Sequence, residues 1–360
     1  MGMSGRLGTL ALIGALTVSA TTGTLGCKRL LRGKNSASKD AGTTTTSGTG
    51  NSPQDDLDEA MQEKLDAYII CLNTLSSPVH ATRARYFSWV NPKTGPTGQE
   101  RNVLGLFDVP NDVVAKCTAG LAKAKLLPPK DVKLEAAGED FAKTVTELDA
   151  LIEEVFTYYE NKNFKDDKFA KGKAIHPKLM AAFNSFSKAD NNLHATLDGI
   201  TKPLAQRALA RIEREEGRKF RYHRKHVLLT ARELVEAGDP VGEDDFVDFA
   251  LYNASFGEYD KALTDLQGFG LLHKGDLDAQ TNTNWPLSKS NFDQFGRAAE
   301  DYRKKSREYL RCLRDAPAKA KTANGKVDPD KMGPCNDGRP RDVVQKYNDF
   351  IHTSNDHQFP

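Results

Sequence analysis

An uninterrupted apolar stripe between Leu134 and Tyr159 limits the folds open to this chain more than any other feature of its sequence. Apolar residues recur there in alternating steps of three and four, over about seven turns of helix. They are Leu134, Ala137, Phe141, Val145, Leu148, Ile152, Val155 and Tyr159. Such a stripe predicts one long helix that packs at a shallow angle against its neighbours, as in a helical bundle.

Shorter segments with the same spacing follow one another from Asp55 to the C-terminus. They cover residues 55–75, 86–90, 112–125, 179–204, 204–237, 244–269, 291–315 and 341–355. Turns rich in Gly, Pro and Asp separate them, and no alternating strand pattern of useful length is present. The sequence therefore predicts an all-α fold, an elongated helical bundle of about seven helices with loops held by disulfides. Two bundles that share a long helix are the alternative.

Two prolines are expected to mark helix boundaries in the middle of the chain. Pro177 follows His176, and the pair is expected to start a helix, because a proline in the first turn lacks an N–H group that would be unpaired there anyway. Pro203 interrupts the apolar pattern that follows. Because an interior proline removes a hydrogen bond and clashes with the preceding turn, we expect a kink or a break at Pro203.

The N-terminus has the pattern of a bacterial lipoprotein signal peptide. Arg6 precedes an apolar run from Leu7 to Val18, and small residues lead to Cys27. The run is short for a membrane-spanning helix, which must cross ~30 Å of hydrocarbon. Thr24 stands where the lipoprotein pattern usually has leucine. We predict that residues 1–27 are a signal peptide and that Cys27 is lipidated.

The residues after Cys27 indicate where the chain is anchored. Lys28 follows Cys27, whereas an aspartate at this position would favour retention in the inner membrane. The periplasmic leaflet of the bacterial outer membrane is therefore the expected location. The alternatives are an exported soluble protein or one anchored in the inner membrane. Residues 28–54, rich in Gly, Ser and Thr, are predicted to be a flexible tether, and residues 55–360 the folded domain. A net charge of +2 gives no reason to predict a nucleic-acid partner.

The cysteines other than Cys27 predict two disulfides. They are Cys71, Cys117, Cys312 and Cys335. In an oxidising compartment such cysteines form lasting disulfides, and four of them allow three pairings. We favour the two pairings that join neighbouring elements, Cys71 with Cys117 and Cys312 with Cys335. Each would stabilise the fold by about 3–4 kcal/mol. No Cys-x-x-Cys sequence suggests redox catalysis.

The connection after the apolar stripe is the most chemically varied part of the domain, and it is the predicted binding surface. Its candidate residues are Tyr158, Tyr159, Asp166, Asp167, Lys168, Lys171 and His176. Aspartate and histidine suit a divalent metal, but the side chains of the adjacent Asp166 and Asp167 are expected to diverge, so a third ligand is not evident and no metal site is predicted. The simpler interpretation is a structural connection between two helices. In it Asp166 or Asp167 is the N-cap of a short helical turn, and Phe164 and Phe169 lie in the core.

A basic run between Arg211 and His226 allows two interpretations. In an exported protein it can bind lipid headgroups or other anionic polymers of the envelope. Alternatively it is a solvated helix face that nearby glutamates neutralise in part. His223 and His226 fall on one helix face, but no carboxylate is spaced to complete a metal site with them.

Segments of the domain resemble a known family. Residues 158–179 (YYENKNFKDDKFAKGKAIHPKL) resemble the hallmark segment of the YiiG-like bacterial lipoproteins, whose function is unknown. The first helix of the family resembles residues 68–73. A loop of the family resembles residues 86–90 followed by residues 95–100. The resemblance extends from about Asp55 to the C-terminus. It implies a lipid-anchored, helical envelope protein. No activity is established for the family, so the resemblance assigns no catalytic residues to this chain.

The sequence lacks the motifs of the common enzyme classes. It has no His-Glu-x-x-His zinc helix, no Gly-x-Ser-x-Gly turn and no phosphate-binding glycine loop. We therefore expect a non-catalytic cell-envelope lipoprotein, without a cofactor, that binds a protein partner or an envelope polymer. The alternatives are a periplasmic enzyme that acts on cell-wall material, with carboxylates brought together only by the fold, and a metal-handling lipoprotein.

Overall fold

The computed structural model describes residues 52–238, 246–273 and 289–356. Across these residues the chain forms eight α-helices, three short 3-10 helices and one pair of two-residue strands, which confirms the predicted all-α class. The strands, β1 (Val247–Asp248) and β2 (Lys326–Val327), pair antiparallel with Val247 opposite Val327. None of the helices described has both the length and the apolar character needed to cross a membrane. The predicted signal peptide with Cys27, and nearly all of the predicted tether, lie outside the described residues.

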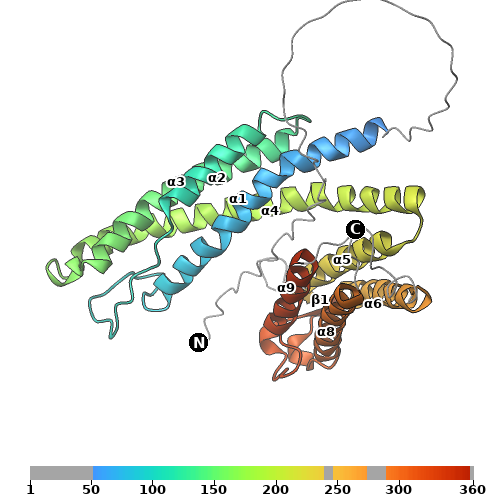
Figure 1. Cartoon of the computed structure of the whole chain (residues 1–360). Coiled ribbons are helices and arrows are strands. Elements are labelled where there is room, and N and C mark those ends of the chain that lie inside the picture. Colours follow the sequence, from blue (N-terminus) through green and yellow to red (C-terminus); the bar gives the residue numbers. More distant parts are fainter. Residues whose placement is uncertain (1–51, 239–245, 274–288, 357–360) are drawn as a thin grey trace, which may run out of the picture.

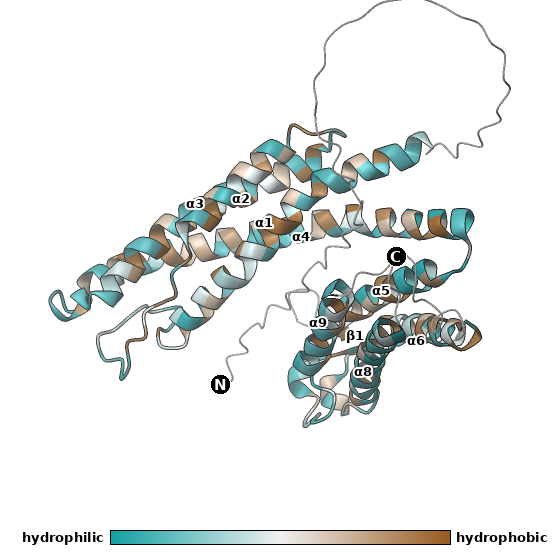
Figure 2. Cartoon of the chain, viewed as in Figure 1, coloured by the Kyte–Doolittle hydropathy of each residue, from teal (hydrophilic) through white to brown (hydrophobic). Residues whose placement is uncertain are grey.

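Four helices form a first bundle. They are α1 (Pro53–Phe87), α2 (Asn111–Ala124), α3 (Val132–Glu160) and α4 (Ala170–Glu216), and they lie along one another in Figure 1. Every residue of the predicted stripe on α3 is buried, and it packs against buried residues such as Leu72 of α1 and Phe183 of α4. Figure 2 shows hydrophobic and hydrophilic residues alternating along these helices. The 3.6-residue period thus places one apolar side of each helix in a common core.

The start of α1 has a clear local cause. Ser52 and Asp55 form a capping box: the Ser52 hydroxyl accepts from the Asp55 N–H, and the Asp55 carboxylate accepts from the Ser52 N–H at 3.1 Å. Pro53 occupies the first helical position. These contacts fix the first turn of α1 at Pro53.

The remaining helices form a second bundle with its own core. They are α5 (Phe220–Ala237), α6 (Phe249–Leu272), α8 (Lys289–Arg314) and α9 (Pro340–Asp356). Buried tyrosines are prominent in this core, and the hydroxyls of three of them donate to backbone carbonyls. Tyr259 bonds to Ala299 O at 2.8 Å and Tyr302 to Ala231 O at 3.2 Å. These bonds satisfy phenol groups that would otherwise be costly to bury.

Helix α4 joins the two cores. It contains 47 residues and is therefore ~70 Å long. Gly217, with a φ of +77°, ends it, and α5 begins three residues later. The structure thus has two bundles, as in the predicted alternative, but the long helix α4 contributes to the core of the first bundle and not to that of the second. The prediction of one helix over residues 204–237 is wrong, because the left-handed backbone at Gly217 divides it.

The predicted helix start at Pro177 is wrong, and Pro203 does not break the helix. Pro177 and Pro203 lie inside α4, which starts at Ala170 and passes through both positions. Residues beside each proline are buried, among them His176, Leu179 and Leu204. Packing of these side chains against the bundle offsets the hydrogen bond that each proline removes. Helix α1 likewise contains Pro78 and continues to Phe87, where a separate short helix was predicted.

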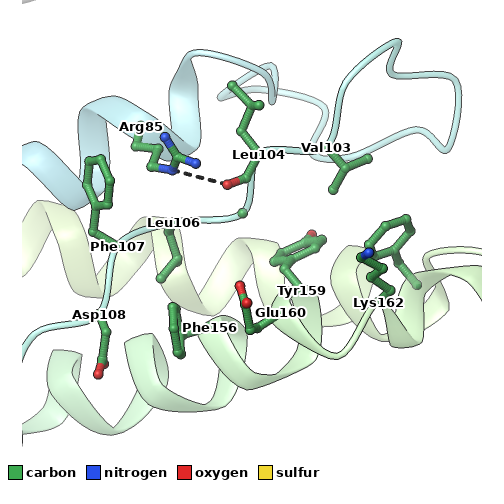
Figure 3. Close-up of a pocket in the computed structure, with 12 residues that line it drawn as sticks. Arg85, Val103, Leu104, Leu106, Phe107, Asp108, Phe156, Tyr159, Glu160 and Lys162 are labelled. Carbon is green, nitrogen blue, oxygen red and sulfur yellow. Dashed lines mark hydrogen bonds between the residues drawn. The ribbon is translucent and has the colours of Figure 1, made fainter.

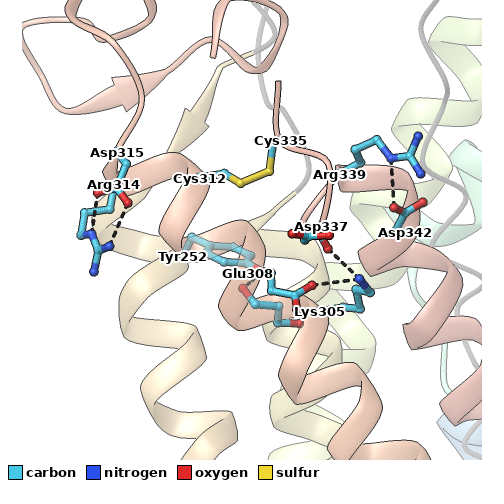
Figure 4. The surroundings of a disulfide bond; sticks show 11 residues. Tyr252, Lys305, Glu308, Cys312, Arg314, Asp315, Cys335, Asp337, Arg339 and Asp342 are labelled. Atoms are coloured by element: carbon cyan, nitrogen blue, oxygen red, sulfur yellow. Dashed lines mark hydrogen bonds and ion pairs between the residues drawn. A yellow bond between two sulfur atoms is a disulfide. The ribbon is translucent and has the colours of Figure 1, made fainter. Parts of the chain in front are cut away.

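Both predicted disulfide pairings are confirmed. Cys71 of α1 bonds to Cys117 of α2, with Cα atoms 4.7 Å apart. Cys312 near the end of α8 bonds to Cys335 in the loop before α9, with Cα atoms 6.0 Å apart (Figure 4). Lys305 holds the same loop, since its Nζ donates to Asp337 O at 2.7 Å. Each bundle therefore has one covalent link of its own.

Candidate functional site

A pocket of about 360 Å³ lies at the end of the first bundle where α1 and α3 both end (Figure 3). Three segments far apart in the sequence line it: Arg85 near the end of α1, residues 103–108 of the following loop, and the last turns of α3 with the turn after them. The pocket thus includes part of the connection predicted to bind a ligand.

Side chains from the end of α1 hold the loop in place through its backbone. Thr82 Oγ1 donates to Phe107 O at 2.9 Å. Arg85 Nε donates to Leu104 O at 3.1 Å, as Figure 3 shows. Trp89 Nε1 donates to Gly105 O at 2.7 Å. These bonds satisfy three backbone carbonyls between residues 104 and 107 of the extended loop and fix which of its side chains face outward.

Apolar side chains surround the pocket. Phe156, Tyr159 and Phe164 lie on its α3 side. The Tyr159 ring meets Trp89 edge-on, with ring centroids 5.0 Å apart. On the loop side, Leu104 is 44% exposed and Phe107 is 48% exposed. Burial raises the pKa of Tyr159 well above its ordinary value, so its hydroxyl stays neutral at physiological pH.

Charged groups of both signs border the pocket. Arg85 lies over the Phe107 ring, with its Cζ atom 4.6 Å from the ring centroid. Lys162, Asp108 and Glu160 are exposed beside it. Two cationic and two anionic side chains leave the opening close to neutral, so it has no field that would select a strongly charged ligand.

The prediction that Asp166 or Asp167 is an N-cap is wrong for α4, whose N-cap position is Phe169, although the Asp167 side chain bonds to the first turn of the helix. Asp167 Oδ2 accepts from the Lys171 N–H at 2.9 Å, and Asp167 Oδ1 accepts from the Tyr158 hydroxyl at 2.8 Å. Burial, followed by the bond to Asp167, raises the pKa of Tyr158 to about 12. Asp166 and Lys168 are exposed, and Lys171 forms an ion pair with Glu154 at 3.0 Å. None of these four residues, Asp166, Asp167, Lys168 and Lys171, lines the pocket.

His176 is buried, and it does not converge with the aspartates. Its Nε2 donates to Pro92 O at 3.1 Å, and its Nδ1 accepts from the Tyr86 hydroxyl at 3.0 Å. These bonds join α4 to the end of α1 and the loop after it. Among the described residues, no three His, Cys, Asp or Glu side chains are grouped closely enough to hold a metal ion.

The family follows from a comparison with known proteins. A family model described as a protein of unknown function (DUF3829) matches residues 59–356. The chain belongs to this family. The uncharacterized protein YiiG of Escherichia coli (strain K12) is 32% identical over 183 residues, which are 51% of this chain and 52% of that protein. The chain thus spans about half the length of the curated relative it matches. No solved structure matches.

Membership of the DUF3829 family confirms the resemblance to YiiG-like proteins. Neither description names an activity. Of the residues predicted to form a binding surface, Tyr159 lines the pocket of this DUF3829 domain. Tyr158 and His176 are buried and bonded within the fold, while Asp166, Lys168 and Lys171 are exposed elsewhere.

The basic run of the DUF3829 domain is largely paired within the fold. Arg218 forms an ion pair with Glu213 at 2.7 Å, and Arg221 pairs with Glu216. Arg224 donates to Ser354 O at 3.0 Å. Burial, followed by repulsion from nearby arginines, lowers the pKa of Lys225 to about 8. These contacts favour the interpretation of a helix face neutralised by its own glutamates.

Most residues of the pocket lie outside the connection predicted to bind a ligand. These residues include Arg85, Leu104, Phe107, Asp108 and Phe156. The signal available was the apolar run of residues 103–107, which lies in a connection between helices and has no helical period. Two of its large side chains are among the exposed apolar residues of the fold. Apolar residues in a loop that stay exposed indicate a contact surface.

Substituting Gly95 by alanine is expected to loosen the loop that lines the pocket. Gly95 has a φ of +72°, and an added Cβ would lie 2.9 Å from the His176 ring. Backbone strain of about 1–3 kcal/mol is expected from this conformation alone. Hydrogen exchange should accelerate in residues 91–107 and stay unchanged in α8. The matched control is Gly120→Ala in α2, where an added Cβ meets nothing within 4 Å and should not accelerate exchange. Equal exchange in both variants would contradict this role of Gly95.

Proposed function

We propose that the protein is a non-catalytic cell-envelope lipoprotein that binds a partner protein through the pocket between α3 and residues 103–108. The observation that carries the proposal is a pocket of about 360 Å³ with the exposed side chains of Leu104 and Phe107 beside it. Its volume falls in the range of ~300–1,000 Å³ typical of sites that take up small groups. An apolar side chain of a partner fits such a lining.

The charges at the opening favour a protein segment over an anionic polymer. A polyanion that approached Arg85 and Lys162 would also meet the carboxylates of Asp108 and Glu160. A protein segment can offer both signs of charge and an apolar side chain between them. Complementary charges at the edge of an interface add specificity and speed association more than they add affinity.

The position of the pocket suits a tethered protein. Arg85 lies near the end of α1, a helix of 35 residues and therefore ~50 Å long. The chain that leads to Cys27 leaves the opposite end of this helix. A lipid on Cys27, as the signal-peptide pattern and Lys28 suggest, would hold the protein at the periplasmic leaflet of the outer membrane. The pocket would then lie on the far side of the bundle, away from the anchor.

Site-specific photocrosslinking in living cells tests this proposal. With a benzoylphenylalanine residue in place of Phe107 in the full chain, we expect a discrete adduct with an envelope protein. The adduct should be lost when Asp108→Lys and Glu160→Lys are combined with the crosslinker. A crosslinker in place of Leu272, 85% exposed on α6, is the control and should not give this adduct. Identical adducts from both positions, or an adduct that the charge reversals leave intact, would contradict the proposal.

A further inference from the structure

We propose that residues 125–133, the turn between α2 and α3 with the first two residues of α3, dock on the surface of an anionic lipid membrane. This inference rests on the proposed lipidation of Cys27. The turn has the sequence KLLPPKDVK, and its outward side chains combine apolar and basic groups. Leu126 and Val132 are each 79% exposed, although large aliphatic side chains are usually buried.

Internal bonds hold this turn in one conformation, so the exposure of its apolar side chains is built into the fold. The Leu127 carbonyl accepts from the buried Lys64 Nζ at 2.9 Å. Asp131 caps α3, since its Oδ1 accepts from the Leu134 N–H at 2.9 Å. Leu126 and Val132 flank this fixed segment and project from it.

Lysines surround the exposed apolar groups. Lys125 pairs with Glu139, and Lys130 lies 3.3 Å from Glu135. Lys123 and Lys133 are exposed and form no ion pair with any residue that the structure describes. A fixed turn that offers both aliphatic side chains and uncompensated lysines suits the interface of a membrane with anionic headgroups, where the apolar groups enter the bilayer boundary and the lysines meet phosphates.

The turn lies at the end of the bundle from which the chain leads to the proposed anchor. Pro129 of the turn borders a hollow of about 230 Å³ together with Gln54 and Leu57 of the first turns of α1. Leu57 is itself 51% exposed. Residues 28–51 span at most ~80 Å, so a lipid on Cys27 keeps this end of the bundle within reach of the bilayer. This proximity favours the membrane as occupant over a second copy of the chain.

Fluorescence of the lipidated full chain on vesicles tests the docking. Leu126→Cys carries a nitrobenzoxadiazole fluorophore, and the vesicles contain phosphatidylethanolamine and phosphatidylglycerol. We expect a blue shift of the emission and quenching by nitroxide-labelled lipid. The matched control is Leu271→Cys on α6, whose side chain has the same exposure of 79% and should show neither effect. Lys123→Glu combined with Lys133→Glu should reduce the blue shift at position 126 at least twofold.

The outcomes separate docking from anchoring. A chain that floats with the vesicles but gives the same emission at positions 126 and 271 is anchored without docking, which overturns this inference alone. A chain that fails to float overturns the proposed lipidation and the docking with it. A blue shift at position 126 that develops without vesicles as the chain is concentrated in detergent would assign the turn to a contact between copies and also overturn the inference.

Discussion

Lys64→Met is expected to lower the free energy of unfolding by about 3–5 kcal/mol at neutral pH. Lys64 is fully buried, and its Nζ lies 2.6 Å from Glu135 Oε1 and 2.9 Å from Leu127 O. Without the ammonium group, the Glu135 carboxylate stays in the bundle with Lys130 at 3.3 Å as its remaining cationic partner. Urea unfolding followed by circular dichroism measures the change. The control is Lys123→Met, at an exposed position of α2, which should leave the free energy of unfolding nearly unchanged.

The effect of Lys64→Met should also depend on pH. The bond from Lys64 lowers the pKa of Glu135 to about 2 from its ordinary value of 4.5. A carboxyl group with a lowered pKa stabilises the fold while it is ionised, so its contribution is complete above about pH 4.5 and is lost as the pH falls toward 2. The difference between the wild-type chain and the variant should therefore shrink over this interval. A difference that stays constant from neutral pH to acid would contradict this assignment.

Removal of the disulfide between α1 and α2 is expected to have an effect of similar size. In Cys71→Ala/Cys117→Ala the free energy of unfolding should fall by about 4 kcal/mol, because the bond closes a loop with a sequence separation of 46 residues. The same loop contains residues 103–108 of the pocket. Hydrogen exchange should therefore accelerate first in α2 and in this loop.

The second disulfide is the control for this experiment. Cys312→Ala/Cys335→Ala opens a loop with a sequence separation of 23 residues and belongs to the other core. Its loss should cost about 3 kcal/mol and accelerate exchange around α8 and α9, with α2 unchanged. If either pair of substitutions accelerated exchange equally in both bundles, the two cores would not be separate units of stability.

The fold was predictable where side chains repeat with a fixed period. The stripe on α3 fixes both a helix and its buried side, since periodicity and burial have the same origin. The two disulfides follow from the short separations within each cysteine pair. The prolines show where this reasoning fails: Pro177 and Pro203 are poor helix residues locally, and only the packing of α4 against two other helices explains why the helix continues through them.

The candidate site was predictable only in part. The connection after α3 was the expected location, and Tyr159 and Phe164 of that region do line the pocket. Its other side comes from Arg85 and from a loop some fifty residues earlier in the chain, and no local pattern indicates that these segments meet. His176 was a candidate ligand because of its residue type. Whether a histidine binds a ligand or bonds within the core depends on its neighbours, here Tyr86 and Pro92.

Attachment to a lipid through Cys27 is the central claim, because the location of the protein and the docking of the turn after α2 both depend on it. Mass spectrometry of the N-terminal peptide of the chain, purified from membranes of a Gram-negative host, tests it most directly. We predict a peptide that begins at Cys27 and carries the mass of a diacylglyceryl group and an additional acyl chain, and we predict that Cys27→Ser abolishes it. A mature chain that retains residues 1–26, or that has a free thiol at Cys27, would contradict the claim.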